Sequence, residues 1–191
     1  MSDAPDHDDD DLLDEYLAVV ARVDAAVADA ATRAGDALVC ARGCHACCAP
    51  GLSVLPVEAE RIARHLESRT VIAGPQTDRC TFLDAAGACQ IYEARPLLCR
   101  THGLALRTSS APARGLKVID DISVCTLNYT TRSPTPAETL DADRILALLV
   151  TVDRRFRIHA GLPDDGSRVS LEALLEPADE QDTDPELEPA T

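Results

Sequence analysis

The first long run of apolar positions in the chain has the spacing of an amphipathic helix. Apolar residues recur every three or four positions between residues 12 and 34, and Gly35 follows them. An α-helix completes a turn in about 3.6 residues, so this spacing places the apolar residues on one face. A glycine often stands just beyond the last helical residue. The predicted inner face consists of Leu13, Tyr16, Leu17, Val20, Val23, Val27, Ala30 and Ala31.

Two more helices are predicted downstream. Pro56 suits the first position of a helix that extends to about Leu66. The sequence Thr-Pro-Ala-Glu at 135–138 has the residues of a capping box, so it predicts the start of another helix, which Gly161 ends at about Ala160. The inner faces are Ala59, Ile62, Ala63 and Leu66 in the first helix and Ile145, Leu148, Leu149, Val152 and Phe156 in the second.

The centre of the chain has a different pattern. Between residues 77 and 128 the apolar periodicity fades, and Gly, Pro and polar residues are frequent. Segments 117–119 and 122–124 are predicted as short strands at most, and a turn at 171–175 is expected to dock. The fold class predicted from these patterns is mainly α, a small helical domain with a loop-rich centre.

The distribution of acidic residues along the chain predicts the domain boundaries. Residues 1–16 hold eight acidic residues and residues 176–191 hold seven, with no Lys or Arg in either segment. The other 18 acidic residues are matched by the 18 Lys and Arg of the chain, so the net charge of -15 comes from the ends. We expect disordered acidic tails at 1–11 and 176–191 around a single domain at 12–175, because such composition cannot bury enough apolar surface to fold.

The composition also argues against several partners. No stretch approaches the roughly 18 consecutive apolar residues that span a bilayer, and no basic stripe carries interleaved aromatics, so neither a membrane nor a nucleic acid is expected. Acidic residues follow Met1 where a signal peptide would have basic and then apolar residues. The expected location is therefore cytoplasmic, where thiols stay reduced. No protein partner is indicated.

Eight cysteines, all between residues 40 and 125, carry the clearest chemical signal. Four of them fall within nine residues, and Cys44 and Cys47 have the two-residue spacing of a metal-binding knuckle. One or two of the eight could instead be small buried apolar residues, and a disulfide scaffold is disfavoured because no signal peptide is present. The predicted metal ligands are Cys40, Cys44, Cys47, Cys48, Cys80, Cys89, Cys99 and Cys125.

The adjacent pair Cys47 and Cys48 restricts how these ligands combine. Side chains of neighbouring residues normally diverge, so this pair is not expected to complete one tetrahedral site. The two thiols serve two metals, share a polynuclear cluster, or include one that is not a ligand. Thiolate sulfur suits zinc and iron–sulfur clusters alike, and the spacing does not choose between them.

Basic side chains close to the cysteines form a second candidate group. Arg95, Arg100 and Arg107 could bind an anionic substrate, because guanidinium groups pair with carboxylate or phosphate. Alternatively they offset the charge of the thiolates and donate to loop carbonyls, which we favour. His45 and His102 could each replace a thiolate as a ligand, although a structural hydrogen bond is the more common role.

The ordered series of cysteine motifs resembles a known family. The motifs are Gly43-Cys44-His45-Ala46-Cys47-Cys48, Cys80-Thr81-Phe82-Leu83 and the segment from Cys89 to Arg100, followed by Thr101-His102-Gly103-Leu104 and the segment from Cys125 to Tyr129. Together they resemble the YkgJ-like cysteine-cluster family of the CxxCxxCC type. The resemblance covers about residues 40–129. Three residues separate Cys40 from Cys44, where the family pattern more often has two.

The resemblance implies zinc or iron chelation. The cofactor it implies is Zn²⁺ or iron, and the iron could be present as an iron–sulfur cluster. A distant relationship to flagellin lysine N-methylases implies the alternative, a metal- or iron–sulfur-dependent enzyme in which Arg95, Arg100 and His102 face a substrate. The chain is short for that activity, and it has no Gly-rich segment after a strand that would hold S-adenosylmethionine. A metal-binding module is therefore the first hypothesis and an enzyme the second.

Overall fold

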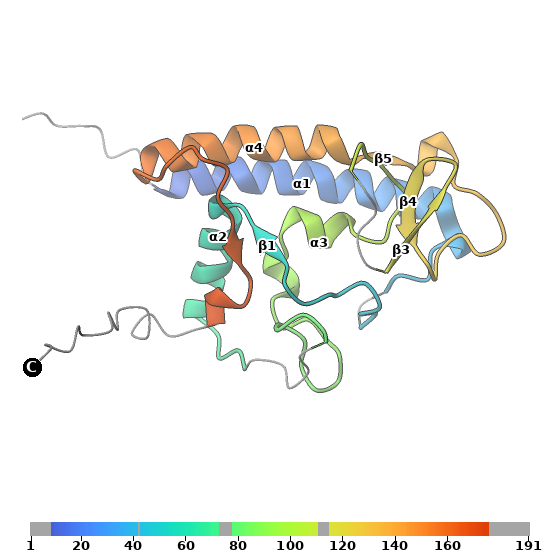
Figure 1. Cartoon of the computed structure of the whole chain (residues 1–191), viewed down its shortest axis with the longest axis horizontal. Helices are drawn as coiled ribbons and strands as arrows, with labels where there is room; N and C mark the ends of the chain where they lie inside the picture. The colour runs from blue at the N-terminus through green and yellow to red at the C-terminus, as the bar shows by residue number, and fades with distance from the viewer. Residues whose placement is uncertain (1–8, 42, 73–77, 111–114, 176–191) are drawn as a thin grey trace, which may run out of the picture.

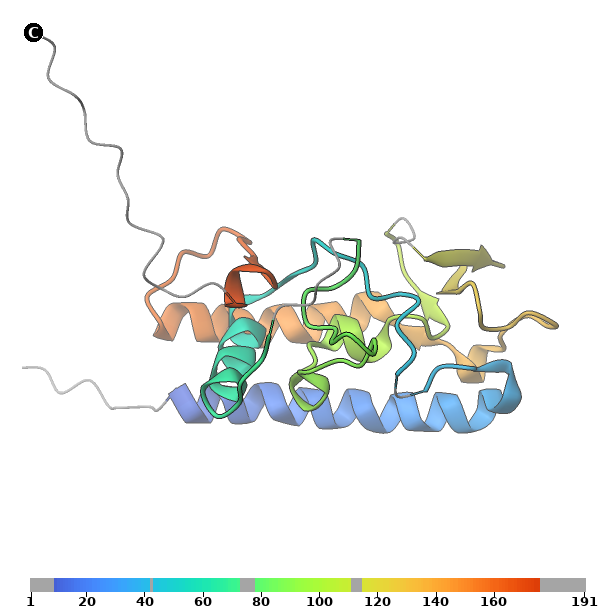
Figure 2. The ribbon, with the colours of Figure 1, turned by 90° about the horizontal axis from the view of Figure 1, so that it is seen from below.

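Two long antiparallel helices form the frame of the molecule. The computed structural model describes residues 9–41, 43–72, 78–110 and 115–175. Helices α1 (Asp9–Ala34) and α4 (Ala142–His159) lie side by side along one edge (Figure 1). Helices α2 (Pro56–Glu67) and α3 (Leu97–Thr101) pack against the same side of this pair, together with the cysteine-bearing segments (Figure 2).

The apolar faces predicted for α1 and α4 meet in the main core, whereas Ala59 and Ile62 of the predicted α2 face belong to a second cluster with Phe82. Burying a Leu, Val or Phe side chain contributes about 1.5–3 kcal/mol, so a seam of this size is the principal stabilising contact of the frame. Ile145 and Leu148 of the predicted α4 face are partly buried against the same core, whereas Leu17 is exposed. The buried members are Leu13, Tyr16, Val19, Val20, Val23, Leu55, Val57, Leu97, Leu149, Val152 and Phe156.

The predicted helices α1 and α2 are confirmed, and the start predicted for α4 is wrong. The capping box is present, but the helix that it starts is only a single 3-10 turn, Pro136–Glu138. The chain then forms strand β5 (Leu140–Asp141), where the amide of Leu140 donates to the carbonyl of Ala105 at 2.9 Å. Because that strand pairing keeps the backbone extended, α4 begins only at Ala142, with the Asp141 carboxylate capping the amide of Arg144.

Two small sheets contradict the prediction of a mainly α fold. Of the described residues 46% are helical and 12% are in strands, so the fold is mixed α/β. One sheet has the order β3-β4-β2-β5, and the other pairs β1 with β6. The bounds not yet given are β1 Ser53–Val54, β2 Leu106–Arg107, β3 Leu116–Ile119, β4 Ile122–Cys125 and β6 Val169–Ser170.

The β3–β4 hairpin explains why the loop-rich centre is more ordered than predicted. Its turn consists of Asp120 and Asp121, both with positive φ, which is the conformation that two-residue hairpin turns require. Aspartate tolerates that conformation better than most residues, so the turn is encoded locally. Pairing of β2 with β4 and β5 depends on contacts far apart in sequence, which periodicity does not report.

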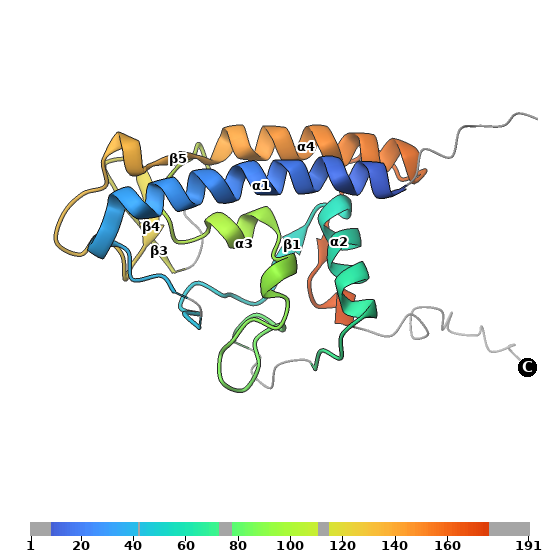
Figure 3. The ribbon, with the colours of Figure 1, turned by 180° about the vertical axis from the view of Figure 1, so that it is seen from behind.

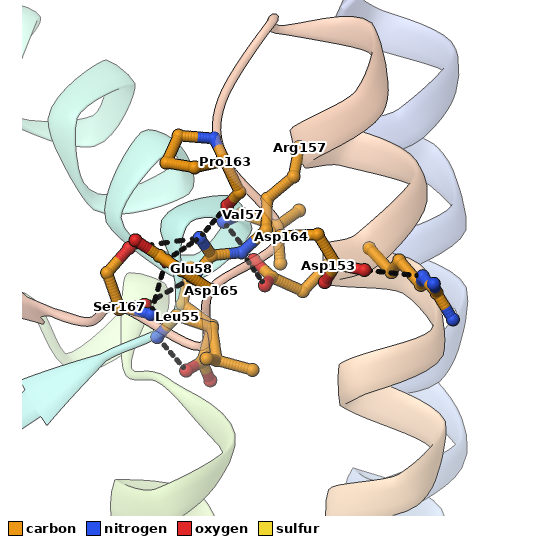
Figure 4. A network of polar contacts seen from close by, with 10 residues as sticks. Leu55, Val57, Glu58, Asp153, Arg157, Pro163, Asp164, Asp165 and Ser167 are labelled. Carbon is orange, nitrogen blue, oxygen red and sulfur yellow. Dashed lines mark hydrogen bonds and ion pairs between the residues drawn. The ribbon is translucent and has the colours of Figure 1, made fainter.

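A buried ion pair joins α4 to the segment that returns toward β1. Figure 4 shows Arg157 reaching from α4 into a group of oxygen acceptors. Its Nε donates to Asp153 at 2.7 Å, and its terminal nitrogens donate to the Pro163 carbonyl at 2.8 Å and to the side-chain and carbonyl oxygens of Ser167. The other Asp153 oxygen accepts from the amide of Val57 at 3.1 Å, at the start of α2. The pair thus links three segments.

We expect Asp153→Ala to lower the free energy of unfolding by about 3–5 kcal/mol, because the Arg157 guanidinium, 2% exposed, loses its buried carboxylate partner and keeps only the more distant, exposed Asp165 at 3.4 Å. The matched control is Asp164→Ala, which removes a solvent-exposed pair with Arg154 and should cost less than about 1 kcal/mol. Urea denaturation of both variants measures the difference. Equal effects of the two substitutions would contradict the assignment of Asp153 as a structural lock.

Candidate metal centre

The first cysteine segment turns back along the frame directly after α1. Residues 38–41 and 43–52 run beneath α3 toward β1 (Figure 3). Two tight turns shape this segment, since the amide of Cys44 donates to the carbonyl of Ala41 at 2.9 Å and the amide of Cys48 to that of His45 at 3.0 Å. Such turns place several thiols on a short stretch of backbone, as a metal knuckle requires.

Seven of the eight cysteines line one cavity of about 330 Å³. Its walls come from the C-terminal half of α1, from α3, and from the loops that carry the thiols. The exception is Cys125, the last residue of β4, which is buried beside the cavity. Seven of the predicted ligands therefore line the same cavity, although up to 59 positions of sequence separate them. The thiols of the cavity belong to Cys40, Cys44, Cys47, Cys48, Cys80, Cys89 and Cys99.

Gly103 and Asn128 hold the first cysteine segment against β4. Gly103 has a φ of +90°, and a Cβ atom placed there would lie 3.3 Å from the Cβ of Cys125 and 3.7 Å from the Sγ atoms of Cys40 and Cys47. The Asn128 side chain, fully buried, donates to the Gly103 carbonyl at 2.7 Å and lies 3.1 Å from Cys40 Sγ. The sequence motifs around residues 103 and 128 contained both residues, but spacing alone gave them no role.

A second set of backbone contacts positions the later cysteines. The amide of Cys80 donates to the carbonyl of Cys48 at 3.1 Å, which joins the two cysteine segments directly. Cys89 pairs with Leu83 in an isolated β-bridge, so the chain folds back on itself between Cys80 and Cys89. Both thiols pack against a small apolar cluster that includes Phe82. Cys99 faces the same cavity from α3.

Burial makes most of these thiols hard to ionise. It is the main cause that raises the pKa of Cys40, Cys80 and Cys89, and it raises the pKa of Cys99 to about 12. Cys47 differs because its sulfur accepts a hydrogen bond from the Cys48 thiol, which lowers the pKa of Cys47 to about 7. The same hydrogen bond raises the pKa of Cys48. Without a cation, most of the cluster therefore favours the neutral thiol.

The three candidate basic residues near the cavity occupy different positions. Arg100 is committed to protein acceptors, since its Nε donates to the Arg95 carbonyl at 2.7 Å and its terminal nitrogens donate to Asp24 at 2.7 Å and the Glu93 carbonyl at 2.9 Å. Arg95 stacks over the Tyr92 ring at 3.8 Å and lines the cavity. His102 also lines it, and burial lowers its pKa, so its imidazole favours the neutral form.

His45 and Arg107 lie elsewhere. The Nε2 atom of His45 is 2.8 Å from a terminal nitrogen of Arg79, and its Nδ1 atom is 3.2 Å from the Gly43 carbonyl. Since the guanidinium can only donate, Nε2 is the acceptor and Nδ1 carries the proton. His45 therefore links two loops rather than facing the cavity residues. Arg107 is exposed on β2.

The thiols of the cavity are suitable ligands for a thiophilic metal, but they do not converge on a single point in this structure. Within the described residues, no three His, Cys, Asp or Glu side chains converge closely enough to hold an ion. The thiols nevertheless share one cavity, and sulfur ligands are those that zinc and iron prefer in such clusters.

We expect Gly103→Ala to weaken metal binding and lower stability, because alanine at this positive φ is strained and its Cβ would crowd Cys40, Cys47 and Cys125. Gly166→Ala is the control: it also has a positive φ, but a Cβ there meets nothing within 4 Å. Zinc titration and thermal melting of both variants separate crowding from backbone strain. A zinc affinity equally affected in both would contradict the role of Gly103.

Comparison with known proteins agrees with this chemistry. Residues 39–122 match the family model named CxxCxxCC, described as "Putative zinc- or iron-chelating domain". The match spans the cavity cysteines and ends before Cys125, and it leaves out α1 and α4. Neither the curated proteins nor the solved structures compared with the chain gave a match. In the described part of the chain, no helix is long and apolar enough to cross a bilayer. Residues 39–122 thus match the same cysteine-domain family that the sequence motifs resemble.

Proposed function

We propose that the protein binds zinc or iron through the thiolates of its cysteine cavity. The observation that carries this proposal is the convergence of seven cysteines, from three separate segments, on one cavity of about 330 Å³, with Cys125 beside it. Thiolates are the ligands expected for zinc and for iron–sulfur clusters. The family match to residues 39–122 supports the same chemistry.

A bound cation would also stabilise the thiolate form of the cavity cysteines. Burial disfavours the thiolate form at Cys40, Cys80, Cys89 and Cys99. A divalent cation reverses this preference, because it attracts thiolates strongly and displaces their protons. Arg95 adds one fixed positive charge and lowers the pKa of Cys47, Cys89 and Cys99, although it is not the largest influence on any of them.

The proposed role of the metal is structural. Cysteine segments 38–52 and 78–95 contain little regular secondary structure, and the described part of the chain has no disulfide. Coordination would connect these segments to α3 and to β4. Because metal ligation in such sites is part of the folding free energy, the bound ion would hold the loops in place on the helical frame.

Removing the metal is expected to lower the melting temperature by more than about 10 °C. Structural zinc sites contribute on the order of 10 kcal/mol, and each 1 kcal/mol shifts the melting temperature by about 2–4 °C for a chain of this size. The measurement compares the metal-loaded chain with a reduced, demetallated sample, with the metal content of each verified by elemental analysis. The α1–α4 core should keep much of its helicity. An unchanged melting temperature after complete demetallation would contradict a structural metal.

One observation favours a catalytic site as a second candidate. Arg95 faces a cavity large enough for a small ligand, and within the described residues its two terminal nitrogens make no hydrogen bond or ion pair. An anionic substrate could bind there, beside a metal that keeps one coordination position open. This would be the arrangement of a metal-dependent enzyme.

An open coordination position can be detected without knowing the substrate. Azide added to the cobalt-loaded chain should change the visible ligand-field spectrum if one position is open, because the anion enters the coordination sphere. The structural proposal expects no change, since four thiolates would saturate the metal. Cobalt is the probe because it replaces zinc in tetrahedral sites and is coloured. A changed spectrum would favour the enzyme and contradict a saturated site.

A further inference from the structure

The contacts around Gly103 gather one subset of the cysteines. Cys40, Cys47 and Cys125 surround this glycine, and the amide of Cys125 donates to its carbonyl at 3.1 Å. Cys44 precedes Cys47 by three residues in the knuckle, and its amide donates at 2.9 Å to the carbonyl of Ala41, the residue that follows Cys40. These four thiols come from the first cysteine segment and from β4.

The remaining four cysteines gather at the other end of the cavity. Cys80 is hydrogen-bonded through its amide to the carbonyl of Cys48, and the bridge at Cys89 brings that residue back toward Cys80. Cys80 and Cys89 pack against the same apolar cluster, and Cys99 of α3 faces the cavity that both of them line. This subset therefore combines one residue of the first segment with three later ones.

The boundary between the two subsets falls between the adjacent residues Cys47 and Cys48. These two thiols share a hydrogen bond, so the subsets are neighbours rather than distant sites. An adjacent pair that belongs to two sites also satisfies the backbone geometry, because each thiol needs to point toward only one centre.

We infer that the chain holds two metal centres, each bound by four thiolates, an inference that rests on the proposed metal-binding function. The first centre takes the subset around Gly103, and the second takes the subset around Cys80. Their ligands are Cys40, Cys44, Cys47 and Cys125 in the first centre and Cys48, Cys80, Cys89 and Cys99 in the second.

Arg95 is placed to serve both centres. It lines the same cavity as Cys47 of the first subset and Cys89 and Cys99 of the second. A divalent ion bound by four thiolates keeps two net negative charges, so two neighbouring centres repel each other. A cation near both reduces this repulsion, which explains why an arginine lies beside the thiols without an acidic partner in the described residues.

Pairs of substitutions distinguish two centres from one shared cluster. The reduced, metal-free full-length chain is titrated with Zn²⁺, and bound ions are counted by native mass spectrometry. We expect two tightly held ions in the wild type. Cys40→Ser/Cys44→Ser and Cys80→Ser/Cys89→Ser should each retain one. The matched control, Cys44→Ser/Cys89→Ser, also loses two thiols, but one from each subset. It should weaken both ions by more than the 10- to 100-fold that loss of an outer-shell contact costs.

A second measurement uses only the wild type, so it tests the inference even if the variants fail to fold. A chelator withdraws one equivalent of zinc, and iodoacetamide then labels the released thiols for mapping by mass spectrometry. The first four cysteines labelled should belong to a single subset. One zinc ion per chain, equal zinc loss in within-subset and cross-subset variants, or labelling that mixes the subsets would each overturn the two centres and leave metal binding intact. Binding of neither zinc nor iron, in the same titration repeated with Fe²⁺ under anaerobic conditions, would overturn the proposed function itself.

Discussion

Packing of α1 against α4 is the interaction on which the rest of the structure depends. The seam formed by residues such as Tyr16, Val20 and Phe156 is continuous and apolar, and it requires no metal. It determines where the cysteines can lie, because the first cysteine segment begins at the end of α1 and α3 packs beside α1. The C-terminal half of α1 also forms one wall of the thiol cavity. The frame thus brings together segments that have little regular structure of their own.

Burial of thiols imposes the second constraint. A cavity that raises the pKa of most of its cysteines favours neutral sulfur until a cation enters. The chain supplies only partial compensation, through Arg95, while Arg100 is tied to Asp24 and to loop carbonyls. The chemistry left to such a site is that of a thiophilic metal, and the number of metals in our proposal follows from the division at Cys47 and Cys48.

Sequence patterns predicted those parts of the fold that depend on local periodicity. The inner faces of α1 and α4 and the extent of α2 follow from spacing alone, since one helix face must be apolar to pack. The late start of α4 did not follow from spacing. The capping box at Thr135 is present, but the hydrogen bond from the Leu140 amide to the Ala105 carbonyl keeps the chain extended after it. The same limit applies to the small sheets, whose strands of two to four residues are too short to show a period.

The candidate site shows the same distinction. Cysteine spacing identified the residues that line the cavity, because clustered thiols carry a chemical signal without any structure. Spacing could not assign Gly103 or Asn128, whose roles depend on a positive φ and on a hydrogen bond across 88 positions. Nor could it divide the eight candidate ligands into the two proposed subsets, since that division depends on which segments the frame brings side by side.

X-ray absorption at the metal edge of the full-length, metal-loaded chain tests the central claim most directly. Sulfur and nitrogen or oxygen ligands differ in bond length, with zinc–sulfur at about 2.3 Å and zinc–nitrogen at about 2.0–2.1 Å. Thiolate coordination in this cavity leads to an expected first shell of about four sulfur atoms per metal. A first shell dominated by nitrogen or oxygen would contradict it, because the metal would then be bound outside the cysteine cavity or by only part of it.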